Sequence, residues 1–440
     1  MSIDPMRHAV DEAAVAQIRR LAKPLTSDAD LDPLVARLSS TDLACIGEAS
    51  HGTHEFYEWR ARLTRRLIQE EHFTWIGVEG DWPDCWRINR WVRGKEGQRQ
   101  SAAQMLQHFD RWPTWMWANR DVADFLDWLR SWNLGRAEAD QVGFYGLDVY
   151  SLWDSLRETI AWLEAHEPSA LPAAMQAWQC FVPYQEDPHR YAWATRLVPE
   201  TCEADVVSLL AEVLRRTEPV RDREDAFNAA QNAEVANNAE RYYRTMVRGD
   251  RQSWNVRDRH MVDTVHRIMR HLGHGAKGVI WEHNTHIGDA RATDMAAAGM
   301  VNVGQLLRQS HGDDKVGLVG FAAHRGTVLA ASAWGDPEVA FVLPEARPAS
   351  HEHLLHHALG RDAVIVFDED RRGPWLAQAR GHRAVGVVYD PSRETGNYVP
   401  TLMGRRYDAL IWLEETAALR PLHHEAPPRE PEFETEPSGF

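Results

Sequence analysis

The chain has 440 residues, of which 44% are hydrophobic and 26% are charged, a balance typical of a globular protein with a large core. Its formal net charge of −16 should repel phosphate backbones and anionic lipid heads, so we expect no nucleic-acid or membrane partner. No stretch approaches the roughly 18 consecutive apolar residues of a membrane span, and the charged, amphipathic start lacks a signal-peptide core, so we expect a cytoplasmic protein.

Short apolar runs rich in branched residues recur along the chain, and each ends in a polar or glycine-containing turn that opens a helical pattern. This alternation of strand and helix is typical of proteins with a parallel sheet. The eight runs are LACIGEAS (43–50), TWIGVEGD (74–81), QVGFYGLDVY (141–150), KGVIWEHN (277–284), VGLVGFAA (316–323), DAVIVFDE (362–369), RAVGVVYD (383–390) and DALIWLEE (408–415). The sequence therefore predicts an α/β fold with a mainly parallel central sheet flanked by helices.

The segment 151–275, between the third and fourth runs, contains no convincing strand. It reads as successive amphipathic helices and is too long for one crossover helix. We expect a helical insertion that either forms a lid or pocket wall or only adds inert bulk. The α/β core then comprises 1–150 and 276–424, and the acidic, proline-rich tail 425–440 is expected to be disordered.

The cysteines give no metal or disulfide signature. They lie far apart without a CxxC pair, so we expect small buried core residues rather than a disulfide framework or a thiolate zinc site. The four are Cys45, Cys85, Cys180 and Cys202.

Two segments have unusual side chains. Tryptophans crowd into FDRWPTWMWANRD, where Trp112 and Trp115 are candidates for the wall of a substrate pocket, although plain core residues are the commoner alternative. A helix over HEHLLHH (351–357) would gather His353, His356 and His357 toward one side, where they could bind a transition metal. A polar surface helix is the commoner explanation of that pattern.

Carboxylates and imidazoles stand at the ends of four predicted strands: Glu48 and His51 after the first, Glu79 after the second, Asp148 after the third, and His283 and His286 after the fourth. Because ligands bind at the carboxyl ends of parallel strands, we expect these residues to share one cleft. Asp148 is a candidate for substrate binding and equally for a helix cap. A whole ring of ionisable groups at apolar strand ends indicates a functional site.

Three chemistries could use this ring. Ser50 as a nucleophile is disfavoured, because the nucleophile elbow needs glycine two residues earlier, where Glu48 stands. Two glutamates with two histidines also resemble the donor sets of zinc, manganese or iron sites. In the third chemistry, His51 is a general base for water and Glu48 or Glu79 fixes its tautomer. This last reaction suits hydrolysis of a small-molecule ester and needs neither a metal nor another cofactor.

The same residues resemble the erythromycin esterase family in three features: a Gly-Glu-x-x-His-Gly turn at 47–52, Arg60 nine residues beyond the histidine, and Glu79 after the second strand. The blocks 281–289 and 383–415 are also similar, and the resemblance spans roughly residues 15–422. It implies an antibiotic-resistance hydrolase that opens macrolide lactones without a required metal.

The family pattern also implies roles for particular residues. It makes His51 the general base and carries over Glu48, Arg60, Glu79, His283 and His286 as further active-site residues. Arg60 rests on the resemblance alone. The alternatives are another ester as substrate, and a metal-dependent hydrolase or a metal- or haem-binding protein on the same fold.

Overall fold

The computed structural model of the chain describes residues 11–97, 99–197, 201–220, 223–247, 250–367 and 373–424. The predicted tail 425–440 and the last two residues of the predicted run 362–369 lie outside the described residues. A search of the described helices finds none that has both the length and the apolar character needed to cross a bilayer.

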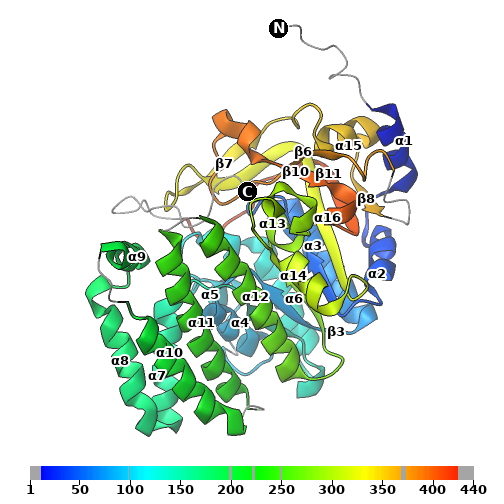
Figure 1. Cartoon of the computed structure of the whole chain (residues 1–440). Helices are drawn as coiled ribbons and strands as arrows, with labels where there is room; N and C mark the ends of the chain where they lie inside the picture. The colour runs from blue at the N-terminus through cyan, green and yellow to red at the C-terminus, as the bar shows by residue number, and fades with distance from the viewer. Residues whose placement is uncertain are drawn as a thin grey trace.

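A nine-stranded sheet forms the centre of the molecule (Figure 1). Its order is β1-β8-β11-β6-β2-β5-β3-β4, and β7 pairs with β6 off this path. The neighbours from β11 to β4 pair in parallel, whereas β8, β1 and β7 pair antiparallel. The strands are β1 (Ala22–Pro24), β2 (Leu43–Ile46), β3 (Phe73–Val78), β4 (Gly143–Gly146), β5 (Lys277–Trp281), β6 (Val316–Ala331), β7 (Glu338–Leu343), β8 (Ala363–Val366) and β11 (Ala409–Thr416). The predicted mainly parallel α/β fold is confirmed.

Both faces of the sheet are buried under helices. Successive strand residues point to opposite faces, so each strand contributes to two hydrophobic clusters. In β2, Ala44 and Ile46 join one hydrophobic cluster, and Leu43 and Cys45 join another. The first cluster contains residues of α2 (Asp32–Leu38), α3 (His54–Glu71), α4 (Trp82–Val92), α5 (Ala102–Leu106) and α6 (Arg120–Asn133). The second contains residues of α1 (Glu12–Leu21), α12 (Asp250–Leu272), α14 (Val303–His311) and α15 (His351–Leu359). Short helices α13 (Asn284–Ile287) and α16 (Met403–Arg406) complete this part.

The predicted strand 383–390 was wrong. Only its first residue belongs to a strand, β9 (Ala379–Arg383), which pairs with β10 (Tyr398–Leu402) in a separate two-stranded sheet. The rest crosses the end of the main sheet, where Val385 N donates to Ala49 O at 2.8 Å and Tyr389 N donates to Ala331 O at 2.9 Å. The alternating apolar pattern therefore reflects backbone pairing with a loop and with the end of β6.

In the described part of 151–275, every regular element is a helix. The α-helices are α7 (Leu152–His166), α8 (Leu171–Phe181), α9 (Pro188–Leu197), α10 (Glu203–Thr217), α11 (Glu224–Met246) and α12. Figure 1 shows them, from cyan-green to green, as a block beside the sheet. The block has its own apolar core, which includes Trp153, Leu209 and Tyr242, whereas α12 also packs on the sheet.

The expectation of four unpaired cysteines was wrong for one pair. Cys180 in α8 and Cys202 at the N-cap of α10 form a disulfide with a Cα–Cα separation of 5.8 Å. Packing of α8 against α10 brings together two residues that are 22 positions apart, and no sequence motif marks such a contact. Cys45 and Cys85 are free and buried, as expected.

Candidate active site

The turn after β2 is held tightly against its neighbours. A Cβ atom at Gly52 would lie 1.7 Å from the carbonyl oxygen of Leu329, so only glycine fits there. The backbone N–H of Asn284 donates to the carbonyl oxygen of Glu48 at 2.8 Å, which ties the turn to the end of β5. Glu48 and His51 are therefore presented at the carboxyl edge of the sheet by a fixed backbone.

His51 and Glu48 form a buried imidazole–carboxylate pair. His51 Nδ1 lies 2.8 Å from Glu48 Oε1, and the other carboxylate oxygen lies 3.1 Å from Arg60 Nη2. The Arg60 guanidinium is completely buried, with the rings of Tyr57 and Trp281 at 4.3 and 4.8 Å. An ionised Glu48 is an acceptor, so His51 Nδ1 carries the proton and its Nε2 keeps the lone pair that a general base needs.

His283 lies beside His51, with ring centroids 4.9 Å apart. As the N-cap of α13, its Nδ1 accepts from the N–H of Thr285 at 3.3 Å and contacts Thr285 Oγ1 at 2.8 Å. Burial and the neighbouring His51 lower the pKa of His283 well below its usual value, although the carbonyl of Ala49 acts in the opposite direction. The neutral ring therefore carries its proton on Nε2, which makes no well-formed hydrogen bond with the described residues.

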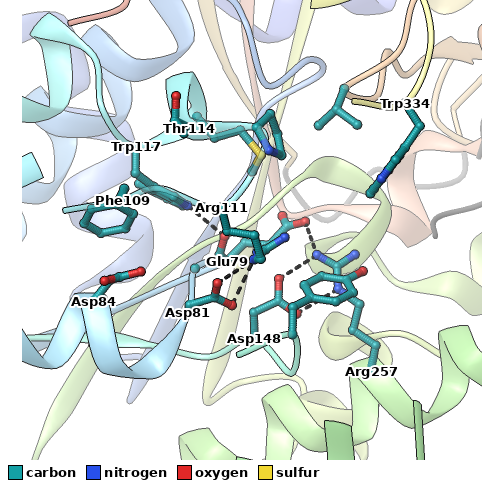
Figure 2. Close-up of a pocket in the computed structure, with 15 residues that line it drawn as sticks. Glu79, Asp81, Asp84, Phe109, Arg111, Thr114, Trp117, Asp148, Arg257 and Trp334 are labelled. Atoms are coloured by element: carbon teal, nitrogen blue, oxygen red, sulfur yellow. Dashed lines mark hydrogen bonds and ion pairs between the residues drawn. The ribbon is translucent and has the colours of Figure 1, made fainter. Parts of the chain in front are cut away.

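Glu79 and Asp148 converge on one buried arginine, Arg257 of α12 (Figure 2). Arg257 Nη2 donates to Glu79 Oε1 and to Asp148 Oδ2, both at 2.8 Å, and Nε donates to Asp148 Oδ1 at 2.9 Å. Burial raises the pKa of Glu79, but the charges of His286 and Arg257 outweigh it and hold the pKa well below its usual range. The ionised Glu79 also accepts from the backbone N–H of His283 at 2.8 Å. This bond joins the second group of residues, around Glu79, Asp148 and Arg257, to the first group, around Glu48, His51 and His283.

His286 completes the second group. Its Nδ1 lies 3.1 Å from both carboxylate oxygens of Asp258, and its ring stacks on Trp254 at 4.5 Å. Its Nε2 lies 3.1 Å from Arg257 Nη1 and 3.5 Å from Glu79 Oε1. Burial lowers the pKa of His286, but Asp258 and Glu79 outweigh it and raise the pKa to about 9. The ring therefore holds a proton at neutral pH, and Glu79 Oε1 is the acceptor that faces its Nε2–H.

A narrow cleft, partly open to solvent, reaches the second group. Glu79, Asp148 and Arg257 line it, together with the aromatic side chains of Phe109, Trp117, Tyr150 and Trp334. Figure 2 shows Trp117 and Trp334 on either side of the Glu79–Arg257 contact. His51 and His283 are each only 2% exposed and do not belong to the described lining. Glu79 therefore lines the cleft, whereas the imidazoles of His51 and His283 lie outside its described lining.

The three predicted substrate-binding residues lie in different surroundings. Asp148 lines the cleft. Trp112 packs on Trp334 with ring centroids 4.6 Å apart and stands just behind the lining. Trp115 is completely buried in the core and is absent from the described lining, so its place in a pocket wall stays a prediction. Its neighbour Trp117 lines the cleft instead.

Arg257 and Asp258 are site residues that sequence reasoning missed. Both lie on α12, are at most 3% exposed, and contact predicted site residues. In the sequence they belong to a run of charged residues, NVRDRH, on a predicted amphipathic helix, and such a run normally indicates a solvated face. Only the packing of α12 on the sheet shows that they point inward.

Ser50 has the position of a turn residue. Its hydroxyl oxygen lies 2.5 Å from Thr53 Oγ1, and the residue is 2% exposed. Thr53 is the N-cap of α3. This arrangement agrees with the expectation that Ser50 shapes the turn rather than acting as a nucleophile.

Asp84 in the cleft should make the protein less stable as the pH rises. Burial and the charge of Asp81 raise the pKa of Asp84 to about 8, whereas an unfolded aspartate has a pKa of about 3.9. Between these two values the unfolded state loses a proton that the folded state keeps. The free energy of unfolding therefore falls by about 1.4 kcal/mol per pH unit and levels off above pH 8.

The Asp84→Asn variant should remove this slope. Urea unfolding at pH 5 and pH 8 would measure it, with a larger gain in stability expected at pH 8. Asp313→Asn, at an exposed position whose charge is not among the causes of the raised Asp84 pKa, is the control and should leave the slope in place. An equal change at both pH values for Asp84→Asn would contradict the raised pKa.

The fold and the site define an α/β protein with a carboxylate–imidazole centre at the carboxyl edge of a parallel sheet, and comparisons with known proteins place it in a family. The family model described as "Erythromycin esterase" matches residues 68–416. The chain therefore belongs to the erythromycin esterase family. A curated relative, erythromycin esterase type II of Escherichia coli, is 28% identical over 120 residues, which cover 27% of this chain and 26% of that protein's length.

Solved structures share the fold across nearly the whole chain. A protein from Bacillus cereus is 19% identical, with a TM-score of 0.77 and coverage of 94% of this chain and 99% of its own. A succinoglycan biosynthesis protein is 18% identical, with a TM-score of 0.75 and coverage of 93% and 98%. A His-to-Asn variant of the erythromycin esterase EreC in its open conformation is 17% identical, with a TM-score of 0.65 and coverage of 89% and 95%.

Proposed function

We propose that the chain is a carboxylic ester hydrolase in which His51 acts as a general base on water. The observation that carries the proposal is the buried Glu48–His51 pair, 2.8 Å long, with the neutral His283 ring beside it. A carboxylate that holds Nδ1–H leaves Nε2 to accept a proton and stabilises the imidazolium that forms. Arg60 balances the charge of Glu48 on its other oxygen.

The reaction would proceed by attack of water on the ester carbonyl carbon. His51 Nε2 takes a proton from water, and the new C–O bond gives a tetrahedral oxyanion. The Nε2–H of His283 is the donor that best fits stabilisation of this oxyanion, since it is buried and has no well-formed partner among the described residues. Collapse of the intermediate breaks the bond to the alkoxide, which takes the proton from the His51 imidazolium. The products are a carboxylic acid and an alcohol.

The second group would set the charge of the cleft. Glu79, Asp148 and Asp258 bring three carboxyl groups to one guanidinium and one imidazole. Arg257 holds Glu79 and Asp148 in place, and Glu79 in turn fixes the backbone of His283. We infer that this group orients the donor imidazole and exchanges a proton through His286, whose pKa is raised to about 9.

The donor arrangement favours a reaction without a metal. Arginines pair with two of the strand-end glutamates, Arg60 with Glu48 and Arg257 with Glu79. A metal ion would have to displace these cations to gain its carboxylate ligands, because like charges repel at such distances. This supports the metal-free route over a zinc- or iron-type centre.

The substrate class follows from the cleft and the family. Its lining combines aromatic rings with carboxylates and Arg257, which fits a mainly apolar ester with several polar groups. A macrolide lactone is the candidate that the family name supplies. The helical block α7–α12 would form one wall, because α12 carries Arg257 into the cleft.

A cytoplasmic location stays a prediction. The Cys180–Cys202 disulfide counts against it, because disulfides are rare in that compartment.

A hydrolysis panel in ¹⁸O-labelled water tests the proposal. Macrolide lactones and simple aryl esters would be incubated with the protein, with and without a chelator, and the products analysed by mass spectrometry. We expect the label in the carboxylic acid product and not in the alcohol, at rates that the chelator leaves unchanged. Loss of hydrolysis on chelation that returns on adding metal would contradict the metal-free route, and absence of hydrolysis across the panel would contradict the esterase assignment.

A further inference from the structure

A second group of potential metal ligands lies among residues that the ester site does not use. His324 of β6, His356 of α15 and Glu414 of β11 each offer one ligand atom, and these atoms all lie within 4.8 Å of one another. Of the four histidines in the helix 351–357, for which metal binding was the less common interpretation, only His356 takes part. Its partners come from two neighbouring strands, which the sequence pattern could not reveal.

His324 is the fixed member of this group. It is 2% exposed, and its Nε2 makes no hydrogen bond within the described residues. A polar atom buried without a partner costs free energy, and an unoccupied binding site is one explanation for it. Nε2 of His324 is therefore available to an ion that also reaches the ligand atoms of His356 and Glu414.

His356 and Glu414 are the adjustable members. Their side chains are 40% and 21% exposed, and His356 Nδ1 contacts Glu414 Oε1 through a short hydrogen bond. The rings of His324 and His356 stack face to face with centroids 3.8 Å apart. Glu414 Oε2 has no hydrogen-bond partner in the described part of the chain. Solvent can therefore reach the side chains of His356 and Glu414 at the place where Glu414 Oε2 has an unused lone pair.

We propose that His324, His356 and Glu414 bind a divalent transition-metal ion of the zinc class. Two imidazoles and a carboxylate form a donor set that holds zinc, with a fourth position for water. Zinc–ligand distances of about 2.0–2.2 Å place tetrahedral ligand atoms roughly 3.4 Å apart, so the most widely separated pair must approach by at most about 1.4 Å. The ring of His356 must also turn out of its stack on His324, so that the in-plane lone pairs of both rings meet at the ion. His356 and Glu414 are partly exposed and can make these movements while His324 stays in place.

The proton balance of binding is defined by the contacts. The Ala346 N–H donates to His324 Nδ1 over 3.4 Å, so Nε2 of the neutral ring carries the proton. When Nε2 binds the ion, this proton moves to Nδ1 and the long Ala346 contact is lost. Binding of His356 through Nδ1 likewise moves its proton to Nε2 and breaks the hydrogen bond to Glu414, whose carboxylate then binds the ion.

Nearby charges do not oppose the ion strongly. Arg383 donates to the carbonyl oxygens of Ala323 and His324, at 3.3 and 2.9 Å, but its guanidinium is paired with Glu394 at 2.9 Å. Arg325 is paired with Glu345 at 3.4 Å. The ion would join α15 to β6 and β11, three elements that are distant in the sequence, and would act as a structural clamp that is independent of ester hydrolysis.

Titration of the full-length apoprotein with Co²⁺ tests this site, since bound Co²⁺ gives a visible absorption band that Zn²⁺ removes when it competes. We expect one ion per chain in the wild type, together with a rise in Tm on adding Zn²⁺. His324→Gln and Glu414→Gln should each lower the affinity at least about tenfold, in line with the loss of one of three protein ligands. Absence of a Co²⁺ band in the wild type would overturn the proposal without reference to any variant.

Two control variants locate the ion. His357→Gln changes an exposed neighbour of His356 on the same helix and should bind as the wild type does. His51→Ala changes the ester site and should also leave Co²⁺ binding intact. Unchanged affinity in both His324→Gln and Glu414→Gln would overturn the proposal, and so would loss of the band only in His51→Ala, which would place the ion in the ester site.

Discussion

Replacing His51 with alanine should lower the rate of ester hydrolysis by about 10²–10⁴-fold, the range that a positioned general base supplies. The side chain is 2% exposed and hydrogen-bonded to Glu48, so its removal also leaves that carboxylate without its imidazole partner. Arg60 remains beside Glu48 and keeps its charge compensated. The loss should therefore appear in kcat, while circular dichroism shows a native fold.

The matched control is His54→Ala, which changes a partly exposed histidine three residues further along the chain. His54 pairs with Asp121 at 2.8 Å, on the surface rather than in the cleft. Its loss should leave kcat within about twofold, because a surface ion pair contributes at most about 1 kcal/mol to stability and nothing to the reaction. Near-normal hydrolysis by His51→Ala would show that another group activates the water.

Replacing Arg257 with alanine should have the second largest effect, on both stability and turnover. Arg257 is the shared cation of Glu79 and Asp148, and all three side chains are at most 3% exposed. Removing one partner of a buried ion pair leaves an uncompensated charge and costs about 3–5 kcal/mol. We expect a fall of this size in the free energy of unfolding, measured with urea at pH 7.

Turnover separates the role of Arg257 in the site from its role in folding. An unpaired Glu79 would bind a proton more readily and would hold the His283 backbone less firmly, so kcat should also fall in the folded fraction. Arg259→Ala, at an exposed position on the same helix, should change neither quantity. In an Arg257→Ala background, Asp148→Asn should recover part of the lost stability; if it lowered stability further, the charge argument would be wrong.

The clustering of the candidate site residues at the strand ends could be predicted because two simple rules act together. Parallel strands end at one edge, and ionisable side chains at apolar strand ends need a partner or a role. These rules applied to Glu48, His51, Glu79 and the histidines after β5, all of which the structure places in two connected groups. The parallel sheet itself followed from the apolar runs.

The remaining features depend on packing between elements, which local patterns do not contain. The inward direction of Arg257 depends on how α12 lies on the sheet, and the Cys180–Cys202 bond depends on how α8 meets α10. Trp115 and Trp117 are close neighbours in the sequence, yet only Trp117 lines the cleft. The apolar alternation of 383–390 predicts a strand, although beyond Arg383 its hydrogen bonds go to a loop and to the end of β6.

The position of Arg257 has a consequence for protein engineering. Because α12 both closes the helical block and supplies the counter-ion of Glu79, the block is not an exchangeable cap. A chimaera that takes its helices from a relative must bring a matching arginine and aspartate into register with the recipient strands. Grafts chosen only to widen substrate range would otherwise lose turnover before any change in selectivity could be measured.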